Sequence, residues 1–305
     1  MQRWIREAHV LVNGAVVRPS LSLRGGEVIE CSPPPTSSGG PAPQPGEIDI
    51  LYEDADVIVV NKTAGVVIHP GAGREEGTLV NHLLARYPEI AGVGSVERPG
   101  IVHRLDVGTT GSLVVARSRA AYQELSLAFQ ERRVRKGYLA IVFGDPDPSS
   151  GTIDRPIARH RTQRRKMAVV AGGREAITHY RRLGTSNGVS LLSIGLETGR
   201  THQIRVHLKS RGLPLVGDPL YGEARWKAHR PPAQAALRDF PRPALHSWVL
   251  EVRHPVLGTP LRIEAPPPSD LVELWRSVSG QALSDLLVPG DQFGADSSSN
   301  CFRSR

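Results

Sequence analysis

Residues 100–106 read Gly-Ile-Val-His-Arg-Leu-Asp, and Thr-Thr-Gly follows at positions 109–111. This order places one acidic side chain, Asp106, in a basic loop bounded by glycine. The apolar run that follows, at 113–116, is typical of a strand. Loops at strand edges often carry functional residues, and the adjacent Arg104 favours a charged carboxylate. The alternative is a turn carboxylate that caps its own backbone, which is common for Asp before Thr and Gly.

A second segment, residues 197–208, offers a cationic partner for that carboxylate. It reads Glu-Thr-Gly-Arg-Thr-His-Gln-Ile-Arg-Val-His-Leu, and we expect it to open on glycine and continue as a helix. Arg205 then shares a face with His202, three residues earlier, while Ile204 and Leu208 face the core. A basic face on a rigid helix suits a loop carboxylate. Judged by position alone, Arg205 is an ordinary surface arginine.

The composition allows one large domain and a small one. The chain has 305 residues, of which 39% are hydrophobic, and 38 Lys and Arg against 30 Asp and Glu give a net charge of +8. A basic balance suits a polyanionic partner, although charge alone does not exclude a protein that is merely basic. Cys31 and Cys301 predict neither a disulfide framework nor a metal site. We find no signal-peptide core and no apolar run long enough for a bilayer, so we expect a soluble cytoplasmic protein without a membrane partner.

Composition divides the chain into four parts. Residues 1–30 contain two short strands around Asn13-Gly14, a strong hairpin signal. Residues 31–47 are rich in Pro, Ser and Gly and predict an extended linker. The main domain then covers 48–278, and the polar segment 279–305 predicts a disordered tail.

The main domain alternates strand and helix patterns. We expect strands at 57–60, 138–143, 191–196, 245–252 and 261–263, the second with both faces covered. We expect three helices, capped by Thr78, Ser118 and Asp270. The first has an apolar stripe of Leu79, Leu83, Leu84 and Tyr87, and the second turns Tyr122, Leu125 and Phe129 inward. The third carries Leu271, Leu274 and Trp275. Strands joined by hairpins and by long helical excursions predict an α+β domain with a mostly antiparallel sheet.

Further blocks of sequence occur in a fixed order between about Ile50 and Trp275. They read Ile-Val-Val-Asn-Lys-Thr-Ala-Gly at 58–65, Val-Ile-His-Pro-Gly-Ala-Gly at 67–73, Lys-Gly-Tyr-Leu-Ala at 136–140 and Val-Gly-Asp-Pro-Leu-Tyr-Gly at 216–222. With the two segments above, they resemble the RluA-type family of RNA pseudouridine synthases. Residues 69–73 and 156–160 are most similar to the branch of large-subunit ribosomal RNA pseudouridine synthase D.

The resemblance implies a fold, a reaction and a substrate. The fold is the bipartite mixed sheet of pseudouridine synthases, with a catalytic cleft across its middle. The reaction is the isomerisation of specific uridines to pseudouridine in 23S ribosomal RNA, as naked RNA or in the assembling large subunit, by an enzyme expected to be a monomer. Residues 2–30 resemble the second half of an alpha-L RNA-binding module. The alternatives are a transfer RNA site, another ribosomal site, or a non-catalytic RNA-binding factor in ribosome assembly.

The resemblance also implies a catalytic set. Asp106 is the catalytic carboxylate, acting as nucleophile or as base, and Arg205 is its ion partner. Tyr138 packs on the target base and takes part in proton transfer, although a tyrosine on a strand is more commonly a core residue. Arg104 enters the stem when the base is flipped out, or contacts phosphate only.

Other residues are assigned to RNA binding. These are His103, for which a structural role is the alternative, Arg200, and a basic run that includes Arg161, Arg164, Arg165 and Lys166. The run suits the RNA backbone, and the alternative is a solvated loop. Two departures from the family pattern are Thr63, where proline is usual, and Val107-Gly108, where charged residues are frequent.

We expect neither a metal nor an organic cofactor. The isomerisation is redox-neutral and needs no energy input. The sequence contains no Cys-x-x-Cys, no His-Glu-x-x-His, no phosphate-binding P-loop and no Gly-x-Ser-x-Gly elbow. Histidines at 69, 82, 202 and 207 lack the spacing of metal ligands.

Overall fold

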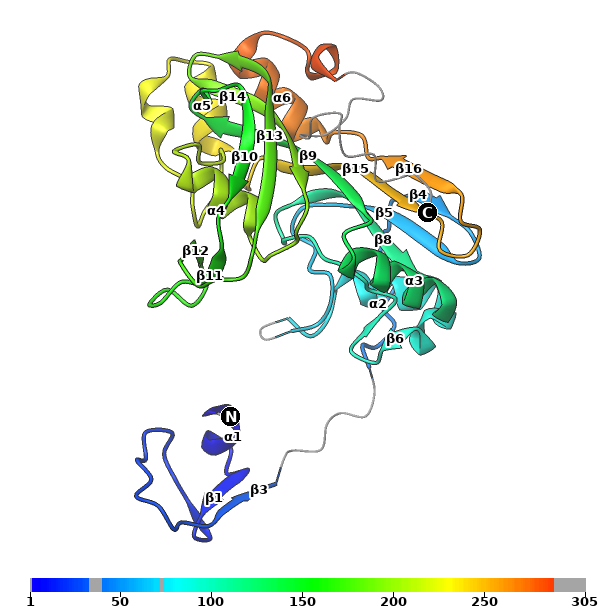
Figure 1. Ribbon diagram of the computed structural model, residues 1–305, viewed down its shortest axis with the longest axis vertical. Helices are drawn as coiled ribbons and strands as arrows, with labels where there is room; N and C mark the ends of the chain where they lie inside the picture. The colour runs from blue at the N-terminus through cyan, green and yellow to red at the C-terminus, as the bar shows by residue number, and fades with distance from the viewer. Residues whose placement is uncertain (1, 33–39, 72–73, 288–305) are drawn as a thin grey trace. The chain divides into compact units, whose positions relative to one another are not determined.

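The computed structural model describes residues 2–32, 40–71 and 74–287. The chain forms two compact units, residues 1–40 and 41–305. Figure 1 labels the elements of both units.

The first unit is a short helix and a three-stranded antiparallel sheet in the order β2-β1-β3. Its elements are α1 (Gln2–Arg6), β1 (Val10–Val12), β2 (Ala15–Val16) and β3 (Ile29–Cys31). The predicted hairpin is confirmed, since Asn13 and Gly14 both have positive φ, at 51° and 74°. Val10 is the one fully buried apolar side chain among the residues described here. So little burial provides little hydrophobic stabilisation.

The second unit contains a nine-stranded sheet in the order β10-β13-β14-β9-β15-β8-β5-β4, with β16 beside β15. The strands are β4 (Ile50–Glu53), β5 (Val57–Lys62), β8 (Thr110–Ala116), β9 (Arg135–Phe143), β10 (Ser150–Asp154), β13 (Ile177–Ser186), β14 (Val189–Leu196), β15 (Leu245–Arg253) and β16 (Pro260–Glu264). Each neighbouring pair is antiparallel except β15 and β8. The predicted α+β class with a mostly antiparallel sheet is confirmed.

The parallel pair β15–β8 is the seam between two halves of the sheet. It is short, with His246 beside Thr110 and Ser247 beside Gly111. Gly111 has a φ of +106°, and a side chain there would collide with the Ser247 carbonyl oxygen. Glycine is therefore required where the halves meet. The Asp106 loop leads directly into β8 and so lies at this seam (Figure 1).

Helices cover both faces of the sheet. They are α2 (Leu79–Arg86), α3 (Arg119–Gln130), α4 (Gln203–Ser210), α5 (Ala233–Asp239) and α6 (Ser269–Ser279), with 3-10 turns at Pro88–Gly92, Arg225–Ala228 and Leu283–Leu286. Two small hairpins are β6 (Gly94–Ser95) with β7 (Arg98–Pro99), and β11 (Ile157–Arg159) with β12 (Met167–Val169). Of the helices in the described ranges, none has the length and apolarity to cross a membrane.

Two of the predicted caps are confirmed. Thr78 forms a capping box with Asn81 at the start of α2, and Ser118 Oγ accepts the Ala121 N–H at the start of α3. The third is wrong, because Pro268 precedes α6 and Asp270 lies in its first turn. The Asp270 carboxylate instead accepts two hydrogen bonds of 2.7 Å from Arg242.

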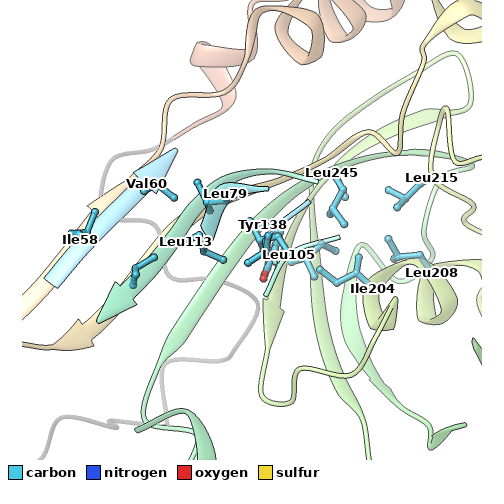
Figure 2. Close-up of a cluster of buried hydrophobic side chains, with 14 of the residues drawn as sticks. Ile58, Val60, Leu79, Leu105, Leu113, Tyr138, Ile204, Leu208, Leu215 and Leu245 are labelled. Carbon is cyan, nitrogen blue, oxygen red and sulfur yellow. The ribbon is translucent and has the colours of Figure 1, made fainter. Parts of the chain in front are cut away.

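Strand β9 separates two hydrophobic clusters, as its alternation predicted. Tyr138, Ala140 and Val142 face a cluster that includes α2 and α4, and the residues between them face a cluster with α5 and α6. Figure 2 shows Leu105 and Tyr138 in the middle of the first cluster, to which Leu113 also belongs. The Asp106 loop is therefore anchored in the core by the residue before the carboxylate.

Two predicted boundaries are wrong. Residues 41–47 were assigned to the linker, but Asn81 on α2 donates to the Ala42 carbonyl at 2.7 Å and its own carbonyl accepts Gln44 N–H at 2.9 Å. These hydrogen bonds bind the segment to the second unit. Residues 279–287 were assigned to the tail, yet Leu283 is 1% exposed and packs beside α6. Residues 33–39 of the predicted linker and 288–305 of the predicted tail lie outside the described residues.

Candidate active site

Asp106 lies in the loop between β7 and β8. Its backbone carbonyl accepts the Thr109 N–H at 3.0 Å, which closes the turn. Its side chain is 18% exposed, and its Oδ2 accepts a hydrogen bond of 2.9 Å from Arg205 Nη1. The backbone therefore makes the turn, and the carboxylate bonds Arg205 rather than capping its own loop.

Arg205 lies between two carboxylates. Its Nε and Nη2 each donate to Asp218 at 2.8 Å, and its Nη1 donates to Asp106. The Asp218 side chain is fully buried and also accepts the N–H groups of Leu220 and Tyr221. This two-pronged geometry fixes the guanidinium plane. Asp218 thus positions the arginine that holds Asp106.

Burial and pairing act in opposite directions on this ion cluster. Burial by itself would raise the pKa of Asp218, but the hydrogen bonds and charge of Arg205 outweigh it, so the pKa is lowered. Burial would lower the pKa of Arg205, but Asp218 and Asp106 raise it above its ordinary value. Arg205 and Asp218 therefore both carry charge at neutral pH. The sequence prediction missed Asp218, although it stands in the quoted block at 216–222.

The segment before Arg205 differs from the predicted helix. α4 begins at Gln203, and His202 has a left-handed backbone with φ 56°. The Gln203 side chain fixes this turn, because it accepts from Thr198 Oγ1 at 2.8 Å and from Arg200 N at 2.9 Å. The helical spacing predicted for His202 and Arg205 is therefore wrong, since His202 lies outside the helix.

The tight turn nevertheless brings His202 to the site. Its Nε2 lies 3.9 Å from Asp106 Oδ2, and its Nδ1 lies 2.8 Å from the Tyr221 hydroxyl. That hydroxyl also accepts the Met167 N–H at 2.7 Å. Burial, with Arg205 nearby, lowers the pKa of His202 despite the opposing charge of Asp106, so the imidazole is neutral at pH 7. The sequence prediction gave His202 no role.

Tyr138 lies on β9 and is 6% exposed. It is both a core residue and a wall of the pocket that contains Asp106. Burial raises the pKa of Tyr138 to about 12, with Asp106 adding to the effect and Ser247 opposing it. The phenol is therefore protonated and uncharged at neutral pH.

This pocket has a volume of about 90 Å³, and because it contains the expected catalytic carboxylate Asp106 we call it the catalytic pocket. Its lining includes Arg104, Leu105, Asp106, Thr109, Tyr138, Leu196, Gly199, Arg200, Thr201, His202, Gln203, Ile204, Arg205 and Leu245. Five of the predicted site residues are thus gathered around one cavity: Asp106, Tyr138, Arg205, Arg104 and Arg200.

A larger cavity of about 790 Å³ adjoins the catalytic pocket, and we call it the basic groove. It shares Arg104, Tyr138, Leu196, Gly199 and Arg200 with the pocket. Its charged lining consists of Arg98, Arg104, Arg132, Lys136, Arg174, Arg200 and a single acid, Glu197. The excess of cations creates a field that attracts anions.

His103 makes contacts within the fold that support the structural alternative. Its Nε2 accepts the Val114 N–H at 3.0 Å, and its ring stacks on Phe129 with centroids 4.5 Å apart. Burial lowers the pKa of His103 to about 3, and Lys136 adds to the effect. The ring lines the basic groove as a neutral group and contributes no charge there.

The predicted basic run lies apart from both cavities. Arg161, Arg164, Arg165 and Lys166 belong to the loop between β11 and β12, and the three arginines are exposed. None of the four is in the lining of either cavity described above. The hairpin contacts the surroundings of the site through Met167, whose N–H donates to the Tyr221 hydroxyl. Ile157 and Val169 of the same hairpin pack in one cluster with Tyr221.

Lys62 holds the Asp106 loop from behind. Its Nζ donates to the carbonyls of Thr63, Val66 and Val107 at 2.9, 3.0 and 3.1 Å, and the residue is 2% exposed. Burial lowers the pKa of Lys62 to about 8. The sequence prediction assigned it no role, although its block is part of the resemblance.

The departure at Val107-Gly108 has a steric context. A Cβ at position 108 would lie 2.7 Å from Pro243 Cδ, so a larger residue would displace the loop or the proline. The Gly108 carbonyl accepts a hydrogen bond of 3.3 Å from Arg242. Glycine therefore fits the packing of the Asp106 loop in this chain. In the described part of the chain, His, Cys, Asp and Glu side chains form no group of three suited to a metal ion.

Comparisons with known proteins identify the family of this chain. The model of the RNA pseudouridylate synthase family matches residues 56–210. The chain is 46% identical to ribosomal large subunit pseudouridine synthase D of Xanthomonas campestris pv. campestris, over 91% of this chain and 83% of that protein. It is 45% identical to the protein of that name in Pseudomonas aeruginosa, over 89% of this chain and 84% of that protein.

A solved structure is similar over most of the same region. Human RNA pseudouridylate synthase domain containing 1 is 31% identical and superposes with a TM-score of 0.60, covering 80% of this chain and 95% of that one. The chain is therefore a member of the RluA-type family of RNA pseudouridine synthases, and its enzyme class is that of an RNA-modifying isomerase.

Proposed function

We propose that this chain converts specific uridines of 23S ribosomal RNA to pseudouridine, with Asp106 as the catalytic carboxylate. The names of the two bacterial relatives support the substrate. The observation that carries the chemistry is the Asp106–Arg205 ion pair, which lies in a pocket walled by Tyr138 and open to a basic groove.

The reaction breaks the glycosidic C–N bond of uridine, turns the base, and joins the sugar to a ring carbon. A carboxylate can assist by attacking the sugar or by removing a sugar proton. Either role requires an ionised carboxylate with one oxygen available. Arg205 engages Oδ2 of Asp106, and within the described residues no hydrogen bond to Oδ1 is formed. The arginine orients the carboxylate through Oδ2 and leaves Oδ1 for the substrate.

Tyr138 is suited to hold the detached base. Its ring offers a flat apolar face, and the high pKa keeps its hydroxyl protonated, so it can donate a hydrogen bond. Leu105 and Ile204 add apolar walls to the pocket, and a base bound between them would displace its water. A dry site strengthens each electrostatic contact made within it.

Arg104 is proposed to help extrude the target nucleotide. It is exposed and lines both the catalytic pocket and the basic groove. A guanidinium can stack in the space that a flipped base leaves, or bind the adjacent phosphates. The basic loop at 161–166 and the unit at 1–40 are proposed as additional RNA contacts, the latter as a partial alpha-L module.

Pseudouridine mapping tests the proposal. Ribosomal and transfer RNA would be compared between cells that lack the chain and cells that express it or its Asp106→Asn variant. We expect pseudouridine to disappear at particular 23S positions and to return only with the wild-type chain. Loss of pseudouridine from transfer RNA alone would show that the substrate is transfer RNA and not 23S ribosomal RNA. Unchanged pseudouridine together with impaired ribosome assembly, corrected equally by Asp106→Asn, would favour a non-catalytic assembly factor.

A further inference from the structure

Lys136 is half-buried and differs from the buried cations of the second unit. Lys62 donates to three carbonyls, Arg205 binds two carboxylates, and Arg242 binds Asp270. The Lys136 ammonium forms neither a hydrogen bond nor an ion pair with the residues that the structure describes, and burial alone lowers its pKa to about 8. A desolvated charge without a partner is costly, so an external anion would stabilise it.

The surroundings of Lys136 leave its ammonium open to the basic groove. Its Nζ lies 5.7 Å from the centroid of the Phe129 ring, which provides a cation–π contact on one side. Gly199 also lies near the amine, and a Cβ built there would be 3.9 Å from Nζ. Both Lys136 and Gly199 line the groove. The amine is thus held in place by an aromatic face while its hydrogen-bond donors remain unused.

The position of Lys136 relative to Tyr138 specifies which anion it meets. The two residues lie on the same face of β9, two positions and about 7 Å apart. A nucleotide whose base packs on Tyr138 in the catalytic pocket must continue into the backbone of its strand. Because the groove shares Tyr138 and Arg104 with the pocket, that backbone has a basic channel beside it.

We infer that Lys136 is the centre of a phosphate-binding subsite in the basic groove, which takes the backbone phosphate that flanks the target uridine. The inference rests on the proposed function, because it requires RNA as the substrate. Arg200 and Arg104 line the same stretch of the groove and extend the subsite toward the pocket. The phosphate replaces the missing carboxylate, and its binding fixes the strand on one side of the flipped nucleotide.

The test is a binding cycle that changes the lysine and the phosphate in turn. All proteins carry Asp106→Asn, so that the RNA stays chemically unchanged. The RNA is a 23S stem-loop that contains the target uridine, with a neutral methylphosphonate at one backbone position at a time. Lys136→Met is compared with Lys227→Met, which removes an exposed lysine whose Nζ lies at the same 5.7 Å from the ring of Trp226 but outside the groove.

We expect Lys136→Met to weaken binding by about 10-fold, the usual size of one charged hydrogen bond. The slope of log affinity against log salt should fall by about 0.7. One methylphosphonate beside the target uridine should weaken the Lys136 protein equally and leave Lys136→Met unchanged. Lys136→Arg should retain the slope, and Lys227→Met should behave as the parent in every assay.

Three outcomes would overturn the inference. The first is that the affinity losses from Lys136→Met and from the methylphosphonate add at every backbone position, which would mean that Lys136 contacts none of these phosphates. The second is a loss of thermal stability in Lys136→Met that accounts for its weaker binding. The third is a wild-type chain that neither binds nor modifies the RNA, in which case the proposed function fails as well. Modification by the wild-type chain without coupling in the cycle would remove only the phosphate subsite.

Discussion

The catalytic pocket and the basic groove share a wall but use charge in opposite ways. In the pocket, Arg205 is enclosed by Asp106 and Asp218. In the groove, Lys136 and Arg104 have no acidic partner within the described residues. The electric fields of paired opposite charges cancel at long range, so the paired groups mainly fix the positions of side chains. Unpaired charges retain their electric field, so they attract an anionic ligand. The two cavities thus divide positioning from binding.

The largest expected effect comes from removing the charge that the pocket positions. Asp106→Asn keeps the shape of the side chain and should lower the single-turnover rate by on the order of 10⁴-fold or more, as loss of a catalytic group does elsewhere. RNA affinity should persist, because the groove is unchanged. Quench-flow measurement of pseudouridine formation, together with filter binding, separates the two. Near-normal turnover would remove Asp106 from the mechanism.

The next largest effect should come from breaking the ion pair between Arg205 and Asp218. Asp218→Asn leaves Arg205 with one carboxylate, which should lower the free energy of unfolding by about 3 kcal/mol. Misplacement of Asp106 should lower kcat by about 100-fold with little change in KM. Asp54→Asn is the control, since it weakens the partly buried His254 pair outside both cavities. Equal kcat losses in the two variants would show that the pocket gains nothing from Asp218 beyond stability.

Charges outside the pocket should affect binding without affecting chemistry. Replacing Arg161, Arg164 and Arg165 together by Ala removes exposed cations from the β11–β12 loop. Each lost phosphate contact should reduce the salt slope by about 0.7 to 0.9, while the single-turnover rate at saturating RNA stays constant. Titrations from low to high KCl measure the slope. An unchanged slope would identify the loop as merely solvated.

A smaller effect is expected from pH. The pKa of Lys136 is lowered to about 8, so its ammonium is charged below this value and neutral above it. RNA affinity should therefore fall several-fold between pH 7 and 9. Lys136→Arg should show a flat profile with the same RNA, because guanidinium stays charged. A fall of equal size in both proteins would place the titrating group elsewhere.

The remaining ionisable lining of the groove does not produce such a fall. The groove is lined otherwise by Arg98, Arg104, Arg132, Arg174, Arg200, Glu197, His69 and His103. Burial, with nearby arginines, lowers the pKa of His69, and the pKa of His103 is about 3, so both imidazoles are already neutral at pH 7. The arginines keep their charge throughout this range.

The smallest effect on catalysis should follow deletion of residues 1–40. These residues form a unit of their own, and the described part of it buries little apolar surface. We expect an unchanged melting temperature for the rest of the chain and normal modification of a small stem-loop. Affinity for a longer RNA should decrease modestly. Unfolding of the remainder, or unchanged affinity for long RNA, would contradict an anchoring role for this unit.

Local chemistry made part of the fold predictable from the sequence. Alternation in β9 predicted that both of its faces are covered, and the caps Thr78 and Ser118 marked the starts of α2 and α3. The wrong predictions depended on distant partners. Residues 41–47 are ordered by Asn81, and Asp270 pairs with Arg242 instead of capping its helix.

The candidate site was predictable mainly through resemblance. The Asp106–Arg205 bond joins residues 99 positions apart, and no local pattern specifies it. Asp218 and His202 were missed because their roles depend on a buried ion cluster and on a left-handed turn at position 202. Neither feature leaves a periodic signal in sequence. Lys136 was quoted in a block, but its missing partner becomes visible only when its neighbours are placed.

The place of β15 has a consequence for the order in which this protein matures during synthesis. β15 lies between β9 and β8, yet it spans Leu245–Arg253, after nearly every other strand of the sheet has left the ribosome (Figure 1). Asp106 and Arg205 belong to halves that only β15 connects in the sheet. A nascent chain shorter than about this length therefore holds both halves of the site without joining them. Activity should switch on late and all at once, after the central strand is inserted.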